Sequence, residues 1–507
     1  MRRSTPGVRC RIVTDNQTPG LAFDNSYARL PDRFFARVAP TPVRDPRLIC
    51  INRELGAELN IAAEWLASPD SVQVLAGNRV APGSEPIAQA YSGHQFGHFS
   101  GTLGDGRAVL LGEVVDQNGR RRDIQLKGSG PTPFSRRGDG RAALGPVLRE
   151  YVVSEAMAAL GVPTTRALAA VTTGETVARE TMLPGAVLTR VASSHIRVGT
   201  FQFFAAAGDA EGVRLLADHV LARLYPEAAT AERPYRALLD AVIGAQAELV
   251  ARWLLVGFIH GVMNTDNASI AGETIDYGPC AFMDAYDPAT VFSSIDHMGR
   301  YAYGNQPAIA HWNLARFAET ILPLLDADEN AAIEQAQDAL AAFGERFQAA
   351  YHGGLRRKIG LVTAQDGDVE LAGDLLKLMA AQAVDLTLLF RRLGDIDLPG
   401  GTDAVRALFS QTPAFEVWAS RWRERLGREN TDAAARRAMM HAANPAFVPR
   451  NHRVAAVIAA AVERDDFEPF AELLTVLSKP YEDQPEFHRY AEPPQMHERV
   501  LATFCGT

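Results

Sequence analysis

The stretch HGVMNTDN at residues 260–267, followed by DYG at residues 276–278, is the part of the sequence that decides the fold. A long apolar helical segment, 238–259, precedes it, and segments 268–270 and 273–275 predict short strands between the two motifs. Asn267 and Asp276 offer amide and carboxylate oxygens, the hard donors that magnesium prefers. The spacing therefore predicts a loop and a hairpin that hold a metal ion bridging phosphates.

The two motifs follow the catalytic-loop pattern of protein kinases, H-R-D-L-x-x-x-N followed by D-F-G. His260 and Asn267 fall in register with that pattern, but Val262 occupies the place of the aspartate that accepts a proton. Valine cannot act as a base. Either the fold has lost transfer activity, or another carboxylate serves, and Asp266 beside Asn267 is the candidate.

A predicted β-hairpin lies further towards the N-terminus, with strands at 109–115 and 122–127 and the turn DQNG at 116–119. Period-two alternation turns Ile124 and Leu126 towards the core, so Lys127 faces the opposite side, towards a cleft. A helix is expected over 146–160. Glu150 and Glu155 on that helix are equally good partners for Lys127, and an ordinary surface ion pair is the alternative.

Phosphate contacts are expected from LGDGR at 103–107, where Gly104 and Gly106 expose backbone N–H groups and Arg107 adds a charge. A tight surface turn is the alternative explanation. Arg190 and Arg197 follow the β-rich segment and could reach a triphosphate. Asp105 in the same turn would repel a γ-phosphate, with little nearby to neutralise it, which indicates a nucleotide placed differently from that of kinases.

His94 and His98 have the i, i+4 spacing of a zinc-binding helix. The intervening glutamate is missing and glycines flank the pair, so we expect structural loop histidines there.

Composition limits the remaining classes of protein. The 507 residues carry a formal net charge of -9, which argues against a nucleic-acid or membrane-surface binder. The 51 basic residues include only four lysines: Lys127, Lys358, Lys377 and Lys479. No secretory signal or membrane span is recognisable, and the four cysteines have no paired spacing. We expect a cytoplasmic monomer.

The pattern along the chain predicts an α+β fold, a protein-kinase-like bilobal fold with a small β-rich N-lobe and a large helical C-lobe. The expected units are an irregular, partly helical N-terminal extension (1–85), the N-lobe (86–205), the C-lobe with the catalytic and metal-binding loops (206–310), and a helical C-terminal region (311–507).

The sequence resembles the selenoprotein O family, kinase-fold pseudokinases that transfer AMP from ATP to protein hydroxyls. The resemblance covers most of the chain. It rests on FDNSYARLP (23–31), YSGHQFG (91–97), QLKGSGPTPFSR (125–136), NTDN (264–267), DYGP (276–279) and RNH (450–452).

The resemblance implies a nucleotide bound in a flipped orientation, with its α-phosphate at the acceptor hydroxyl of a Ser, Thr or Tyr side chain and pyrophosphate as the leaving group. Asp266 would accept the proton, Asn267 and Asp276 would hold Mg²⁺ or Mn²⁺, and Glu150 would pair with Lys127. Transfer of UMP from UTP is a variant of the same activity. The residues that would contact ATP are Gly104, Gly106, Arg107, Lys127, Asp139, Gly140, Arg190, Arg197 and Asp276.

The resemblance also implies redox control by a cysteine near the C-terminus, here Cys505, paired with a cysteine of the activation loop. In some members that second cysteine stands at about the position of Phe292, so Cys280 would have to replace it.

Three functions stay open at this point: an AMP transferase, a kinase-type phosphotransferase, and a nucleotide-binding scaffold without turnover. Val262 argues against the second, and the intact set of Lys127, Asn267 and Asp276 argues against the third.

Overall fold

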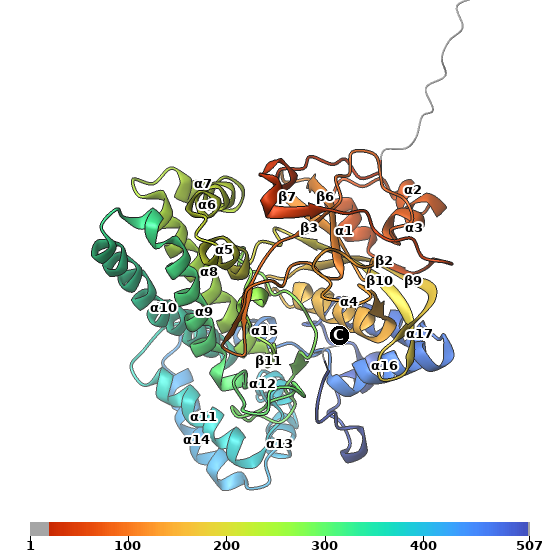
Figure 1. The fold of residues 1–507 in the computed structure, drawn as a ribbon. Coiled ribbons are helices and arrows are strands. Elements are labelled where there is room, and N and C mark those ends of the chain that lie inside the picture. Colours follow the sequence, from red (N-terminus) through yellow and green to blue (C-terminus); the bar gives the residue numbers. More distant parts are fainter. Residues whose placement is uncertain (1–19, 505–507) are drawn as a thin grey trace, which may run out of the picture.

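A computed structural model describes residues 20–504. Its N-terminal part contains an antiparallel sheet of eight strands in the order β1-β3-β6-β7-β10-β9-β2, with β8 beside β10 (Figure 1). The strands are β1 (Phe35–Arg37), β2 (Arg47–Ile51), β3 (Ile87–Gln89), β6 (Ala108–Val115), β7 (Arg121–Lys127), β8 (Ala142–Ala143), β9 (Arg166–Ala178) and β10 (Met182–Ala192).

The predicted hairpin is confirmed as β6 and β7, joined across the DQNG turn. Ile124 and Leu126 are fully buried, in a core formed with α1 (Arg53–Glu58), α2 (Ala63–Leu66) and α3 (Pro69–Leu75). The opposite side of β9 and β10 packs on α4 (Leu144–Ala159). Helices therefore cover the sheet on both faces, and Lys127 lies on the α4 side.

Three local expectations need correction. The segment expected as an irregular extension supplies β1 and β2, the two edge strands of the sheet. The helix expected over 146–160 begins earlier, at Leu144, because Pro146 fits in the first turn, where no intrahelical N–H bond is needed. The strands expected at 268–270 and 273–275 are isolated bridges, Arg197 with Ser269 and Thr164 with Thr274.

The chain after the sheet is mainly helical, and α8 packs along α9 and α10 in one large apolar core (Figure 1). The helices are α5 (Val198–Ala206), α6 (Ala210–Leu224), α7 (Pro226–Ala229), α8 (Pro234–Val256), α9 (Gln306–Leu325), α10 (Glu329–Lys358), α11 (Asp368–Gln382), α12 (Leu386–Leu393), α13 (Gly401–Arg406), α14 (Thr412–Leu426), α15 (Ala433–Ala443), α16 (Asn451–Arg464) and α17 (Glu468–Leu477).

The last two helices return to the sheet part of the molecule. Side chains of α16 and α17 share a buried cluster with α4, and Figure 1 shows them below that helix. The chain end therefore supports the helix that carries Glu150. No helix within residues 20–504 has both the length and the apolar character needed to span a membrane.

Candidate active site

A cavity of about 690 Å³ is lined from both the sheet and the helical part of the chain. It is hereafter the cleft. All residues that the sequence analysis assigned to nucleotide, metal or proton transfer line it: Gly104, Gly106, Arg107, Lys127, Asp139, Gly140, Arg190, Arg197, Asp266, Asn267 and Asp276. Val262 also lines it, whereas Glu150 and Cys280 do not.

Lys127 bridges two carboxylates at the floor of the cleft. Its Nζ lies 2.6 Å from Glu150 Oε2 and 2.8 Å from Asp276 Oδ1. Glu155, the alternative partner, instead pairs with Arg166 at 2.8 Å. Burial by itself would raise the pKa of Asp276, but the charges of Lys127 and Arg190 hold that pKa well below its usual range. Asp276 is therefore ionised and available to a cation.

Asp276 also has an uncommon backbone conformation. Its φ is +67°, in the left-handed region that non-glycine residues seldom occupy. Strain of this kind persists where the surrounding structure imposes it, as it often does at functional sites. Here the conformation accompanies the contact between the Asp276 carboxylate and Lys127.

Two buried arginines complete the charge balance of the cleft. Arg190 Nε donates to Glu150 Oε1 at 2.8 Å. Arg197 lies 3.5 Å from Asp105 Oδ1, with its guanidinium 4.4 Å from the Tyr91 ring centroid. The expectation that little would neutralise Asp105 is therefore wrong, because Arg197 lies far from it in sequence but beside it in space.

The glycine-rich turn is supported by packing and hydrogen bonds from residues that the sequence analysis did not single out individually. Gly104 has φ +66°, and a Cβ there would lie 2.2 Å from the Phe134 ring. Thr132 Oγ1 donates to Asp105 O at 2.6 Å, and Ser135 Oγ donates to Gly106 O. The sequence signal for this support is the TPFS run at 132–135, in the loop that follows the strand ending at Lys127. The turn is therefore shaped by packing and is not an unsupported surface turn. The expectation that Gly104 and Gly106 expose backbone N–H groups is wrong, because these groups donate to Tyr91 O at 3.1 Å and to Gly104 O at 2.9 Å.

Asp266 lies in a single 3-10 turn, Thr265–Asn267, and is 8% exposed. Burial raises its pKa to about 6, opposed by the hydrogen bond from Gln95 and the charge of Arg197. Its Oδ1 is buried and has no hydrogen-bond partner among the described residues. Oδ2 is thus held by Gln95, whereas Oδ1 is enclosed beside Gly93. A carboxyl whose pKa lies near the working pH suits the acceptance of a proton.

The pair His94 and His98 belongs to a small hairpin, β4 (Gly93–Gln95) and β5 (His98–Ser100), that packs on the loop 264–267. His94 N donates to Thr265 Oγ1 at 2.7 Å, and Phe96 N donates to Asn264 Oδ1 at 3.1 Å. His94 Nδ1 lies 2.8 Å from the amide of Gln202. The two histidines thus sit on different strands, and the hairpin braces the loop that carries Asp266.

Oxygen donors for a metal are present in the cleft. Asn267 donates its amide Nδ2 to Val262 O at 3.0 Å, which leaves the amide oxygen available as a ligand. With the ionised carboxylate of Asp276, this oxygen pair fits a hard divalent cation. Within residues 20–504 there is no cluster of three or more His, Cys, Asp or Glu side chains of the kind that binds a metal without other ligands.

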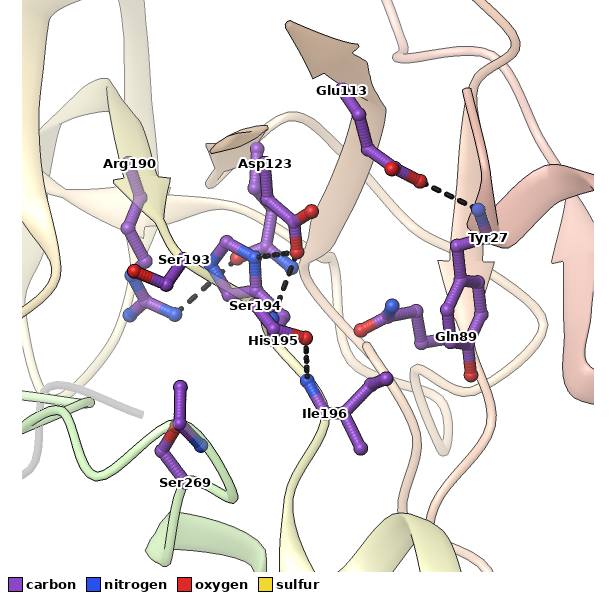
Figure 2. Close-up of polar contacts among 12 residues, drawn as sticks. Tyr27, Gln89, Glu113, Asp123, Arg190, Ser193, Ser194, His195, Ile196 and Ser269 are labelled. Carbon is purple, nitrogen blue, oxygen red and sulfur yellow. Dashed lines mark hydrogen bonds and ion pairs between the residues drawn. The ribbon is translucent and has the colours of Figure 1, made fainter. Parts of the chain in front are cut away.

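A buried polar network joins the β6–β7 hairpin to neighbouring segments (Figure 2). His195 Nδ1 and its backbone N both lie within 2.9 Å of Asp123 Oδ2, and Tyr27 N donates to Glu113 Oε1 at 2.6 Å. Arg223 from α6 pairs with Asp123 and, at 3.1 Å, with Glu113. The network joins β6 and β7 to a helix of the second part, which fixes the strand that ends in Lys127.

The cysteines proposed for redox control are only partly described. Cys280 is fully buried, and burial raises the pKa of its thiol to about 12. Cys505 lies outside the described residues. Thr503, two residues earlier, donates its hydroxyl to Pro279 O at 2.5 Å and its backbone N to Phe292 O at 2.7 Å. The described chain end therefore packs against the segment that follows the DYG motif.

A supported glycine-rich turn, buried cations and hard oxygen donors around one cavity define a site of the class that binds phosphate groups. Comparison with known proteins identifies the family. The family model described as "Protein adenylyltransferase SelO" matches residues 18–478. This chain belongs to that family, which confirms the resemblance and makes it a nucleotidyltransferase.

Curated relatives cover almost the whole chain. A protein nucleotidyltransferase YdiU of Rhodopseudomonas palustris (strain BisB18) is 68% identical over 485 residues, which is 96% of this chain and 99% of the relative. A protein of the same name from Methylorubrum populi is 68% identical over 492 residues, with the same shares. One from Bradyrhizobium diazoefficiens is 65% identical over 485 residues, again with the same shares.

Proposed function

We propose that this protein transfers AMP from ATP to the hydroxyl of Ser, Thr or Tyr side chains in other proteins and releases pyrophosphate. The observation that carries the proposal is the cleft itself. Lys127, Asp276, Asn267 and Asp266 share it, while Val262 stands where a kinase has its base. Relatives that are 65–68% identical are named protein nucleotidyltransferases, which supports the same activity here.

The chain's own residues account for the chemistry. Lys127, Arg190 and Arg197 neutralise charge on the triphosphate, and Arg107 at the end of the glycine-rich turn adds a further guanidinium. The backbone N–H groups of Gly104, Asp105 and Gly106 take no part, because they donate to carbonyl oxygens within the protein. Asp139 and Gly140 at the cleft rim complete the nucleotide contacts. The oxygen of the acceptor hydroxyl attacks the α-phosphorus in line, and Asp266 accepts the proton of that hydroxyl. The bond between the α-phosphorus and the pyrophosphate oxygen breaks, and pyrophosphate leaves.

Asn267 and Asp276 would hold a magnesium ion, which supplies charge neutralisation at the phosphates when bound. Glu150 keeps Lys127 and Arg190 apart and directed at the cleft. Manganese with UTP is the corresponding proposal for UMP transfer, since the cations named here would act on the phosphates, which ATP and UTP share.

The fold supports a kinase-like, two-lobed interpretation. In this proposal the N-lobe (86–205) carries α4 and the sheet strands from β3 to β10, and the segment 206–310 with both motif loops is the C-lobe. The segments 1–85, which adds β1 and β2 to the sheet, and 311–507 are extensions. The pairing of Lys127 with Glu150 on α4 is the arrangement that kinase-type lobes use to aim an ammonium at phosphates.

We place the activity in the cytoplasm, where ATP is supplied. Cys50 and Cys280 are unpaired thiols in the described part of the chain, as expected in a reducing compartment. Regulation by a bond between Cys280 and Cys505 stays a proposal, tested by the mass of alkylated protein before and after reduction.

The test is incubation of the protein with an acceptor protein and ATP labelled at either the α- or the γ-phosphate. Protein-bound α-label that disappears in Lys127→Ala and Asp276→Ala supports the proposal. Protein-bound γ-label would establish a kinase, and no label with retained ATP binding would establish a scaffold; either result refutes AMP transfer.

A further inference from the structure

A second cavity, remote in sequence from the motifs of the cleft, lies where four helices end. Its volume is about 290 Å³, and its lining comes from the C-terminal ends of α4, α8, α10 and α15 together with Tyr481. Arg252, Arg357 and Lys358 line it, and no carboxylate does. We call it the helix-end pocket.

Lys358 is the unusual member of this lining. It is 5% exposed, and its Nζ lies 4.6 Å from the centroid of the Phe390 ring. Within residues 20–504 the Lys358 ammonium has no carboxylate partner and donates no hydrogen bond. Burial lowers its pKa to about 7, with no neighbouring charge contributing. A buried ammonium without a counter-ion is costly, and an arriving anion would remove that cost.

A competing explanation for the cations in this pocket is that the carbonyl groups at the C-termini of the four helices attract them. Arg252 fits this explanation, because its Nη1 donates to Gly161 O at 2.7 Å. Tyr481 likewise donates to Leu160 O at 3.1 Å. Arg357 and Lys358 donate to no carbonyl and form no ion pair with the described residues. Helix capping therefore leaves the buried Lys358 unexplained, whereas Arg357 is exposed and its guanidinium is solvated.

The surroundings of the pocket extend its positive character. An adjoining cavity of about 600 Å³ shares Arg252, Leu255 and Arg357 with it and adds Arg346, against one carboxylate, Glu248. Charged groups beyond the lining are already paired: Arg391 on α12 binds Asp483 at 2.6 Å, and His441 lies 3.0 Å from Asp395. No nearby acid is thus available to Lys358.

We propose that the helix-end pocket binds a phosphate-bearing anion through Lys358 and Arg357, with Arg252 at its edge. Phosphate is the favoured chemistry because a dianion matches several cations better than a single carboxylate does. Apolar walls from Leu160, Val162, Leu255 and Val256 favour a phosphorylated organic molecule over free phosphate. This inference does not depend on the reaction in the cleft.

Because the chain has only four lysines, the NMR signal of each one can be resolved and assigned. The full-length protein labelled with ¹³C at lysine Cε has only four lysine signals to assign. It is titrated with inorganic phosphate and with phenyl phosphate, against sodium chloride at matched ionic strength. We expect the Lys358 signal to move saturably and the pH at which Lys358 titrates to rise. Tighter binding of phenyl phosphate assigns the site to an organic phosphate, and equal binding assigns it to the free ion.

Two neighbouring arginines provide matched variants. Arg357→Gln should weaken phosphate binding by about tenfold or more, whereas Arg356→Gln, which does not line the pocket, should leave it unchanged. Lys358→Met keeps the apolar stem and should abolish binding measured by calorimetry. A Lys358 signal that does not respond, a response confined to Lys127 in the cleft, or equal binding by both arginine variants would overturn the proposal.

Discussion

Gln95 Nε2 donates a hydrogen bond of 3.2 Å to Asp266 Oδ2, joining residues 171 positions apart in the chain. Gln95 comes from the β4–β5 hairpin, and the hairpin's backbone also bonds to Asn264 and Thr265. A Cβ on Gly93 would lie 2.6 Å from Asp266 Oδ1, so the hairpin backbone also packs directly on the carboxylate. The proposed base is therefore oriented by a segment outside its own loop.

Replacing Gln95 by methionine should lower kcat for transfer by about 10- to 100-fold, since a hydrogen bond to a charged group is lost while side-chain volume is kept. The KM for ATP should change little, because Gln95 acts on Asp266 and not on the phosphates. Steady-state kinetics separate the two constants. His98→Ala, at the exposed tip of the hairpin, is the control; an equal loss in that variant would contradict the positioning role.

Transfer should depend on pH through Asp266. Because burial raises the pKa of this carboxyl to about 6, the ionised base is lost as pH falls below that value. The rate at saturating ATP should then fall about tenfold per pH unit below pH 6. The hydrogen bond from Gln95 lowers this pKa, so Gln95→Met should move the fall to higher pH. A flat profile from pH 5 to 8 would rule out Asp266 as the base.

Two glutamates on α4 should respond differently to removal of their charge. Glu150→Gln weakens the hold on Lys127 and Arg190, and displacement of these cations should reduce transfer by about 100-fold. Glu155→Gln removes the partner of Arg166 and should affect thermal stability more than transfer. Labelling assays and melting curves on both variants test this contrast, and equal transfer by the two variants would refute it.

Acid should destabilise the fold through His219 on α6. Burial lowers the pKa of His219 to about 4, and its Nε2 has no partner among the described residues. The unfolded chain binds a proton at about pH 6.5, so the free energy of unfolding falls as pH drops from about 6.5 towards 4, by about 3 kcal/mol. His219→Gln should show a smaller loss in urea unfolding between pH 7 and pH 4.5. The exposed His497→Gln is the control and should behave as the unmodified protein does.

Several parts of the fold were accessible from local patterns alone. The DQNG turn and the period-two alternation identify β6 and β7, and the long apolar segment 238–259 identifies α8. The edge strands β1 and β2 were not recognised. They are three and five residues long in a proline-rich segment, and their strand conformation depends on pairing with β3 and β9. Short strands of this kind have no periodicity long enough to detect.

The sequence by itself determined which chemical groups this protein brings to its cleft: Lys127, Asn267, Asp276 and the substitution of valine for a base at position 262. Local spacing suffices there, because each motif is a continuous run. Only the tertiary structure decided between Glu150 and Glu155, placed Arg197 against Asp105 and Gln95 against Asp266, and buried Lys358 without a counter-ion. Those relations arise between segments far apart in the chain, where packing determines which charges meet and which lose their water.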